Sequence, residues 1–385
     1  MRIASMTVTP VAMADPPLRN SVGVHQPVAL RIVVQLRSDE GAVGLGEASG
    51  GSARLAALQA AVPSVVGRDP RHLNALREDL PRPDVYSPIE VACLDLVGQA
   101  AGVPVVDLLG GPVRDTVPFS AYLFFKNAGH AGEPADAWGE VLTAEAMVQE
   151  ARTFVARWGF PALKVKGGVL PPLEEARTME LLRQAFGPEM PLRLDPNAIW
   201  SVETSLEVAR AVEPLHLEWL EDPARGMEDM AQVRAGTPVP LATNMCIVSF
   251  EHLRRAAELR PVDVILTDHH FWGGLRDSVR LSLFCRDFGF GLGMHSNSHF
   301  GISMAAMVHL GAAMPHLTAA CDTHYPWLDQ DIVAGDPFHF EQGGLCVPAG
   351  PGLGVRLDEE RFQAAAERYR RAGITDRDDT AGVRP

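Results

Sequence analysis

The chain has 385 residues, of which 46% are hydrophobic and 21% are charged, and its formal net charge is −14 at pH 7. This length is ample for a large hydrophobic core and for two or three domains. The acidic balance argues against a nucleic-acid-binding protein, which would favour a basic face, although a local positive site can still hold an anionic substrate.

Other features of the composition exclude further classes of protein. The five cysteines are scattered and form no C-x-x-C pair, so we expect small buried side chains in a reducing compartment, and neither a disulfide framework nor a zinc site. Residues 1–20 contain no unbroken apolar stretch of the kind that marks a secretory signal. No window approaches the ~18 consecutive apolar residues that a membrane helix needs. These features predict a soluble, cytoplasmic protein.

Residues 1–115 begin with strands and continue with helices. Strand-like stretches cover residues 3–11, 28–37 and 43–47, and helical patterns of apolar residues cover 52–66 and 88–101. Strands followed by helices predict a compact α+β unit over residues 1–115.

From about residue 116 the pattern becomes a regular α/β alternation. Eight apolar strand candidates cover residues 117–124, 162–167, 191–195, 216–220, 239–243, 262–267, 288–294 and 317–321. Helical patterns between them cover residues 144–158, 173–186, 202–212, 250–259, 275–288 and 303–313, and the segment 348–385 holds one more at 359–372. From the second onward the strands start roughly 25–30 residues apart, which predicts a (β/α)8 barrel over residues 116–347. An open doubly wound sheet would also alternate, but polar strand ends favour closure, and without a G-x-G-x-x-G or a P-loop nucleotide binding has no support.

The second to eighth strands each end in a side chain that can bind a metal ion, move a proton or hold a polar ligand. These residues are Lys164, Lys166, Asp195, Asn197, Glu221, Asn244, Asp268, His295, Asp322 and His324. Because active groups of (β/α)8 barrels lie at the carboxyl ends of the strands, we expect them to meet at one mouth of the barrel.

Asp195, Glu221 and Asn244 are hard oxygen donors from three successive strands. A set without Cys or His favours Mg²⁺ over zinc or copper. Any one of them could instead cap the following helix, but capping does not explain the set.

Lys164 and Lys166 are alternate residues of one apolar strand, so both side chains face the same way. Beside a divalent cation and each other, their ammonium pKa values should be lowered, and a lysine tuned in this way can take a proton from carbon. The alternative is a pair of solvated lysines on an edge strand.

Asp268 and His295 could form a dyad in which the aspartate fixes the tautomer of the imidazole and raises its basicity. His295 could instead be structural, or form half of a His-x-x-x-His metal pair with His299, but no H-E-x-x-H supports zinc hydrolysis. Four more residues could reach the site from loops or serve structure alone: His25, Tyr122, His269 and His270.

The stretches around these residues resemble the enolase superfamily and, within it, the glucarate dehydratases. They are LKVKGGVL (163–170), LDPNAIWS (194–201), EDP (221–223), LATNM (241–245), DHHFW (268–272), HSNSHFGIS (295–303) and CDTH (321–324), and VPVVDLLGGPVR (103–114) resembles the superfamily's junction between capping domain and barrel. An Asn at the third metal position, followed in order by HSN-x-H and DTH, is specific to the acid-sugar dehydratases.

This resemblance implies a capping domain at 1–115 that is completed by 348–385, and a homo-oligomer. It implies Mg²⁺ held by Asp195, Glu221 and Asn244. Lys166 would be one acid/base with Lys164 as charge partner of the substrate carboxylate, and His295, supported by Asp268, the acid/base on the opposite face. Substrate contacts would come from Asn197, Asn297, His324, His25, Tyr122 and Arg377.

The reaction implied is the dehydration of an acid sugar such as D-glucarate or L-idarate in carbohydrate catabolism. A proton α to a carboxylate is removed, the enediolate is stabilised by Mg²⁺, and the β-hydroxyl leaves as water. The segment 224–236 is shorter than in the family, which leaves Glu221 or Glu228 as the second ligand. The alternatives are an epimerase or racemase, a dehydratase of another aldarate or aldonate, a ligand-binding paralogue without turnover, and a metal-dependent hydrolase, which would need several His ligands.

Overall fold

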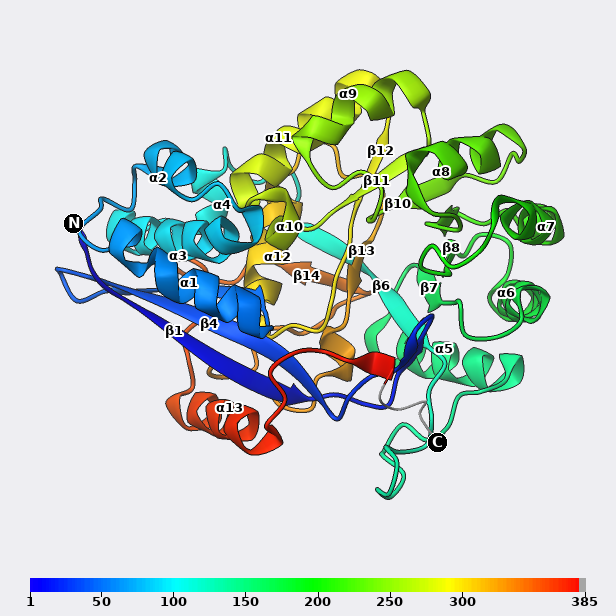
Figure 1. Ribbon diagram of the computed structural model, residues 1–385, viewed down its shortest axis with the longest axis horizontal. Helices are drawn as coiled ribbons and strands as arrows, with labels where there is room; N and C mark the ends of the chain where they lie inside the picture. The colour runs from blue at the N-terminus through cyan, green and yellow to red at the C-terminus, as the bar shows by residue number, and fades with distance from the viewer. Residues whose placement is uncertain (381–385) are drawn as a thin grey trace.

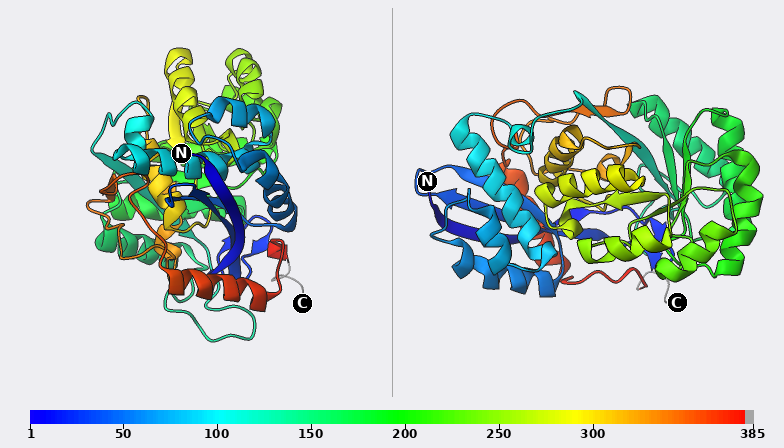
Figure 2. Two further views of the ribbon diagram at one scale, coloured as in Figure 1. Left: turned by 90° about the vertical axis from the view of Figure 1, so that its left-hand side faces the viewer. Right: turned by 90° about the horizontal axis from the view of Figure 1, so that it is seen from above.

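The computed structural model describes residues 1–380, so residues 381–385 of the predicted C-terminal segment lie outside it. The chain forms a capping domain beside a barrel (Figures 1 and 2). The capping domain has a three-stranded antiparallel sheet in the order β1-β4-β5. Its strands are β1 (Ile3–Ala14), β4 (Val28–Ser38) and β5 (Val43–Ser49), and its helices are α1 (Ser52–Val65), α2 (Leu73–Asp79) and α3 (Pro83–Ala101), followed by the short α4 (Val105–Leu108).

Helix α3 lies directly on strand β5 because two glycines of the strand have no side chain to separate them. A Cβ atom at Gly44 would stand 2.1 Å from the carbonyl oxygen of Ala92, and one at Gly46 would stand 1.9 Å from that of Pro88. The helix starts five residues before the predicted residue 88, at Pro83, where a proline fits the first helical turn.

Eight parallel strands form the barrel, in the order β12-β11-β10-β9-β8-β7-β6-β13. They are β6 (Thr116–Phe124), β7 (Leu163–Lys166), β8 (Leu192–Asp195), β9 (Trp219–Glu221), β10 (Leu241–Thr243), β11 (Val264–Thr267), β12 (Gly291–Met294) and β13 (Cys321–Thr323). Between β12 and β13 the amide of Thr318 donates to the carbonyl oxygen of Leu292 at 2.9 Å, which nearly closes the ring. The predicted (β/α)8 barrel is confirmed, but its eighth strand begins at Cys321, later than the expected residue 317, and Thr318 makes its contact outside the ladder.

The helices that surround the barrel are α5 (Ala144–Trp158), α6 (Pro172–Phe186), α7 (Val202–Val212), α8 (Gly226–Ala235), α9 (Phe250–Leu259), α10 (His269–Trp272), α11 (Leu275–Phe288) and α12 (Gly301–Ala313), with 3-10 turns at Glu213–Leu215 and Tyr325–Trp327. Side-chain caps fix where two of them begin, because Thr143 accepts from the amide of Ala146 and Ser201 from that of Thr204.

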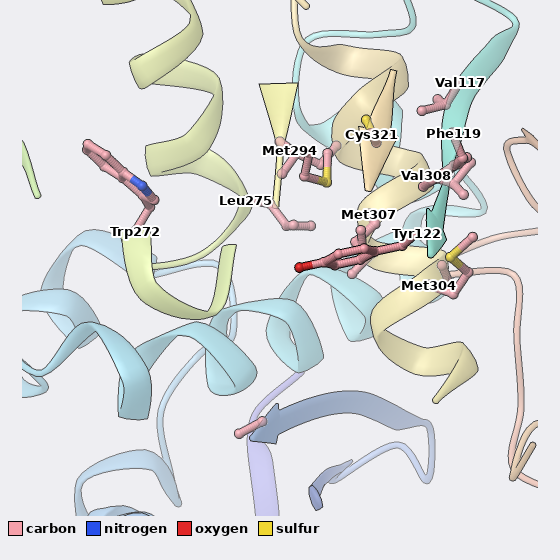
Figure 3. Close-up of a cluster of buried hydrophobic side chains, with 14 of the residues drawn as sticks. Val117, Phe119, Tyr122, Trp272, Leu275, Met294, Met304, Met307, Val308 and Cys321 are labelled. Atoms are coloured by element: carbon pink, nitrogen blue, oxygen red, sulfur yellow. The ribbon is translucent and has the colours of Figure 1, made fainter. Parts of the chain in front are cut away.

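Helix α12 is buried along its whole length. Its residues Met304, Met307 and Val308 lie beside β6, the strand of Val117 and Phe119 (Figure 3), and the helix also packs on β5. A helix that is apolar all round is expected where two layers cover it. The core is therefore continuous from the barrel into the capping domain.

The end of the chain returns to the capping domain. Helix α13 (Glu359–Ala372), red in Figure 1, packs on β1, and strand β14 (Gly344–Cys346) pairs with the start of β6. The residues after α13 run to the small ribbon of β2 (Arg19–Asn20) and β3 (Gly23–Val24), where Asn20 donates to Asp379 at 2.7 Å. No described helix has the length and apolarity needed to cross a membrane. Four of the five cysteines are buried as predicted, but Cys346 is exposed at the end of β14, opposite the exposed Thr116 that begins β6.

Candidate active site

A pocket of about 710 Å³ opens at the carboxyl ends of the barrel strands, beside β2–β3 and the end of the chain. Nine of the predicted site residues line it: His25, Tyr122, Lys166, Asn197, Asn244, His295, Asn297, His324 and Arg377. The other four, Lys164, Asp195, Glu221 and Asp268, are buried behind its wall. A second pocket, of about 780 Å³, is lined by none of the thirteen.

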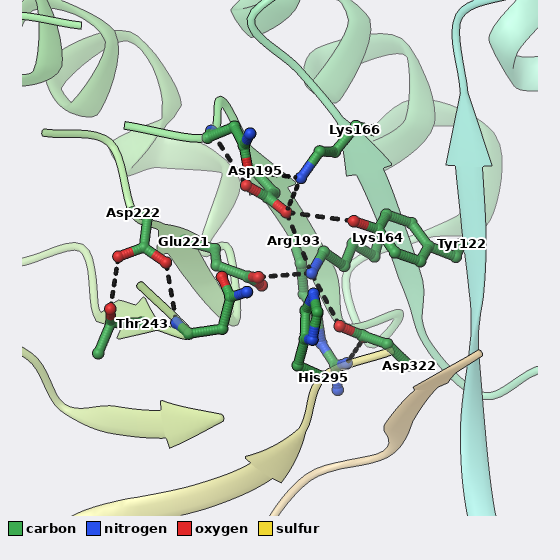
Figure 4. A network of polar contacts seen from close by, with 12 residues as sticks. Tyr122, Lys164, Lys166, Arg193, Asp195, Glu221, Asp222, Thr243, His295 and Asp322 are labelled. Carbon is green, nitrogen blue, oxygen red and sulfur yellow. Dashed lines mark hydrogen bonds and ion pairs between the residues drawn. The ribbon is translucent and has the colours of Figure 1, made fainter. Parts of the chain in front are cut away.

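Lys164 is fully buried, and three carboxylates surround its nitrogen (Figure 4). Its Nζ lies 2.6 Å from Glu221, 2.8 Å from Asp322 and 3.2 Å from Asp195. Burial alone would lower the pKa of this ammonium group, but Asp322 and Glu221 outweigh burial and hold the pKa well above its usual value. The contacts of Lys164 within the chain therefore raise its pKa, whereas the predicted lowering supposed a divalent cation beside the lysine and stays a prediction.

Lys166 lies at the pocket wall. Its Nζ donates to Asp195 at 2.8 Å and to Asn197 at 2.9 Å. Both lysines thus reach the same carboxylate, Asp195, as the alternation of the strand predicts. Burial would raise the pKa of Asp195, but Lys166 and Lys164 outweigh it, so the pKa lies well below its ordinary value.

Two further charged residues belong to this network: Asp322, expected at a strand end without a specific role, and Arg193, which was not predicted. Asp322 accepts from Lys164 and, at 3.1 Å, from Arg193. Arg193 is two residues before Asp195 on β8, so the alternation of that strand already placed both side chains on the barrel interior. Arg193 and Asp322 were detectable as charged residues within apolar runs.

The predicted metal ligands form a suitable donor set. The Oδ1 atom of Asn244 is buried and has no hydrogen-bond partner among the described residues, which is costly unless a ligand takes it. Burial and the nearby Asp195 raise the pKa of Glu221 well above its usual value, so its ionised carboxylate is destabilised. A bound cation would stabilise that carboxylate. The oxygens of Asp195, Glu221 and Asn244 therefore fit Mg²⁺. Glu228 does not belong to the set, because it is 67% exposed on α8 and pairs with Arg255.

Asp222, the middle residue of E-D-P, holds the end of the next strand. It accepts from the hydroxyl of Thr243 and, at 2.8 Å, from the amide of Asn244. Its own φ of 39° lies in the left-handed region, as does that of Asn197 at 61°. Backbone of this kind is strained for residues other than glycine and is held in place by such contacts.

Asp268 and His295 meet as predicted, with His295 Nδ1 3.0 Å from one oxygen of Asp268. The other oxygen lies 2.8 Å from Nδ1 of His270. Asp268, His269 and His270 form the one described group of three or more His, Cys or carboxylate side chains close enough to hold a metal ion, but imidazoles already engage both oxygens of Asp268. His299 places Nδ1 3.1 Å from the carbonyl oxygen of Phe300 and Nε2 3.5 Å from the hydroxyl of Thr323.

Two side-chain pairs also lie at the pocket. His25 is paired with Asp15 at 3.0 Å, and Arg377 is paired with Asp379. His324 lines the pocket as well, and its Nδ1 is buried without a partner among the described residues. A ligand in the pocket is the remaining source of a hydrogen bond for that atom.

The chain matches two family models. Residues 2–110 match the mandelate racemase/muconate lactonizing enzyme N-terminal domain, and residues 146–361 match the enolase C-terminal domain-like model. A probable glucarate dehydratase from Streptomyces coelicolor is 43% identical over 416 aligned residues, which cover 100% of this chain and 96% of the relative.

Solved structures of two relatives have nearly the same fold. An enolase from Mycobacterium smegmatis in complex with tartrate has a TM-score of 0.96 and 52% identity, covering 99% of this chain and 94% of that chain. An enolase from Thermobispora bispora in complex with magnesium and formate has a TM-score of 0.96 and 49% identity, covering 99% of this chain and 96% of that chain.

Proposed function

Because this chain belongs to the enolase superfamily and is similar to its acid-sugar dehydratases, we propose that it is a Mg²⁺-dependent dehydratase of a six-carbon diacid of the D-glucarate or L-idarate type. The observation that carries the proposal is that two candidate acid/base groups, Lys166 and His295, line the same pocket. Lys166 comes from β7 and His295 from the loop that follows β12, on different sides of the barrel.

The two groups have complementary tasks. The proton α to a carboxylate is removed by Lys166 or by His295, according to the face of the substrate that carries it. Protonated His295 then donates its proton to the departing β-hydroxyl, so that the C–O bond breaks, water leaves and an enol remains. The enol tautomerises to a 4-deoxy-5-keto diacid.

The proton is too weakly acidic for a side chain unless the negative charge that develops on the carboxylate is stabilised. Mg²⁺ bound by Asp195, Glu221 and Asn244 would supply most of that stabilisation when present. Lys164 adds a fixed positive charge from behind the wall. Asn197 accepts from Lys166 and orients its amine toward the pocket.

A diacid is supported by the cationic side chains of the pocket. Arg377 lines it in addition to Lys166, and His25, Asn297 and His324 offer further polar atoms. The relative from Mycobacterium smegmatis binds tartrate, a hydroxylated dicarboxylate. Tyr122, whose hydroxyl lies 3.3 Å from Asp195, closes the side of the pocket.

Epimerisation at the same carbon is the second candidate function. With a base on each face, a proton removed by Lys166 can be replaced from His295, which would interconvert glucarate and idarate. The same contacts support both reactions, so the product decides between them.

The test incubates the protein with Mg²⁺ and a panel of hexarates and hexonates, and detects α-keto acid with a carbonyl reagent. We expect a metal-dependent keto product from D-glucarate or L-idarate. We expect Lys166→Ala and His295→Asn to lower kcat by at least about 100-fold. A panel without any keto product, or full dehydration by His295→Asn, would contradict the proposal. Epimerisation without dehydration would favour the second candidate.

A further inference from the structure

A chain of buried polar contacts connects the capping domain to the imidazole of His295. Arg31 of β4 places one guanidinium nitrogen 3.0 Å from Nε2 of His270. His270 places Nδ1 2.8 Å from Asp268, and Asp268 places its other oxygen 3.0 Å from Nδ1 of His295. All four residues are buried, and Arg31 is only 2% exposed.

The direction of each hydrogen bond follows from the first. A guanidinium group can only donate, so Nε2 of His270 must accept and its ring proton must sit on Nδ1. Nδ1 then donates to Asp268, whose other oxygen accepts from Nδ1 of His295. In the neutral imidazole of His295, Nε2 is then the nitrogen without a proton, and it can act as a base in the pocket.

Asp268 has to remain ionised for this arrangement. Burial would raise its pKa, but His270 and His295 outweigh burial and hold the pKa well below its usual value. The backbone amide of His270 adds a further donor at 2.9 Å. A protonated Asp268 would lose an acceptor that the two imidazoles share.

Arg31 is itself held rigidly. Glu47 of β5 accepts from Arg31 at 2.6 Å, and it also accepts from the amides of Phe300 and Ser303 at the start of α12. The hydroxyl of Ser303 lies 3.0 Å from Nε2 of His270. Through Arg31 and Glu47, the capping domain therefore holds both the segment that follows His295 and the His270 ring that contacts Asp268.

We propose that Arg31 and His270 are positioning residues that act through Asp268 to hold His295 in the tautomer and orientation of a base. Without Arg31, His270 can carry its proton on Nε2 and then presents a lone pair to Asp268. The dyad would lose its fixed orientation although Asp268 and His295 are unchanged. The effect is confined to the face of the substrate that His295 serves, because Lys166 depends on Asp195 and Asn197 instead.

The first test measures exchange of the α-proton in D2O with the two epimeric diacids, and its kinetic part rests on the proposed function. His295→Asn and Lys166→Ala identify which epimer uses which base. We expect His270→Leu to slow the exchange that needs His295 by about 10–100-fold and to leave the exchange that needs Lys166 within about threefold. His270→Asn keeps a donor where Nδ1 stood and should recover much of the loss.

A purely structural role would slow both exchanges alike, and that result would overturn the proposal, as would unchanged rates. His309→Asn is the matched control. His309 is also buried, accepts from the amide of Val106 and contacts the carbonyl of Leu353, but it has no link to Asp268. The His309→Asn variant should change the α-proton exchange of both epimers to the same extent.

The second test needs neither substrate nor metal, so it stands if the proposed function fails. Nitrogen NMR of protein labelled at histidine reports which ring nitrogen carries the proton. We expect Nδ1–H for His270 and His295 in the wild-type protein, and a mixture for His270 in Arg31→Met/Glu47→Gln, a double change that leaves no buried charge unpaired. An unchanged His270 tautomer in that variant would overturn the role of Arg31.

Discussion

The side chain of Asn244 indicates a ligand site through one unpaired atom. Its Oδ1 is buried without a partner among the described residues, while its backbone amide is held by Asp222. The side chain is thus fixed in place but unsatisfied. In a protein whose other buried polar groups are mostly paired, this marks a position built for a ligand.

Replacing Asn244 by Leu should therefore separate stability from metal binding. Without Mg²⁺ the free energy of unfolding should stay within about 1 kcal/mol of wild type, because an unpaired acceptor is removed. The affinity for Mg²⁺ should fall by at least about 10-fold. It is measured by calorimetry on protein from which metal ions have been removed with a chelator. Asn297→Leu makes the same change elsewhere on the pocket wall and should leave the affinity for Mg²⁺ unaltered. An Asn244→Leu variant with wild-type affinity would remove this residue from the ligand set.

Elements with strong local signals were predictable from the sequence. Helices α5 and α7 have the predicted bounds because side-chain caps and amphipathic spacing mark them, and α9 has the predicted bounds because of its amphipathic spacing. Helix α8 is not among the predicted helices, since it begins with a glycine and buries only Met230 and Val233. The two-residue strands β2 and β3 have no periodicity to detect.

The packing of elements on each other is less visible in the sequence. Nothing local distinguishes Gly46, which is needed because α3 lies on β5, from Gly67, which ends a turn with φ of 85° and where an added Cβ atom would meet nothing within 4 Å. The first requirement comes from a segment about forty residues away along the chain.

Gly46→Ala tests that distinction. A Cβ atom there meets the rigid backbone of Pro88, so we expect the free energy of unfolding to fall by about 3 kcal/mol or more. Gly67→Ala, which adds only the strain of a left-handed backbone, should cost about 1–2 kcal/mol. Urea unfolding of both variants gives the comparison. A smaller loss for Gly46→Ala than for Gly67→Ala would mean that α3 moves away from the strand easily.

At the scale of the whole molecule, the contacts between the capping domain and the barrel are the features that could not be predicted from the sequence. The strand-end residues were predictable because barrel geometry brings them together whatever the loops do. Arg31, by contrast, is one charged residue in an apolar strand, and its partner His270 is 239 positions away. Only the docking of the two domains reveals that they meet, and pairing of this kind has no local periodicity.

Glu90 is a second such connection. It lies on α3, and its carboxyl group accepts at 2.6 Å from the amide of Leu275 at the start of α11. It is 1% exposed, and burial raises its pKa from 4.5 to about 8. The folded protein therefore binds a proton at Glu90 between these two values, where the unfolded chain does not.

This linkage fixes the sign of a pH effect. Stability from the protonated carboxyl is fully present below about pH 4.5 and is lost as the pH rises to about 8, so the free energy of unfolding should fall through that window. Glu90→Gln keeps an acceptor for Leu275 and carries no charge. It should raise the free energy of unfolding at pH 8.5 by on the order of 3 kcal/mol and approach wild type near pH 5. Urea unfolding at both pH values measures the difference, with the exposed Glu228→Gln as control. A Glu90→Gln protein less stable than wild type at pH 8.5 would show that the ionised carboxylate, and not its neutral form, holds the two domains together.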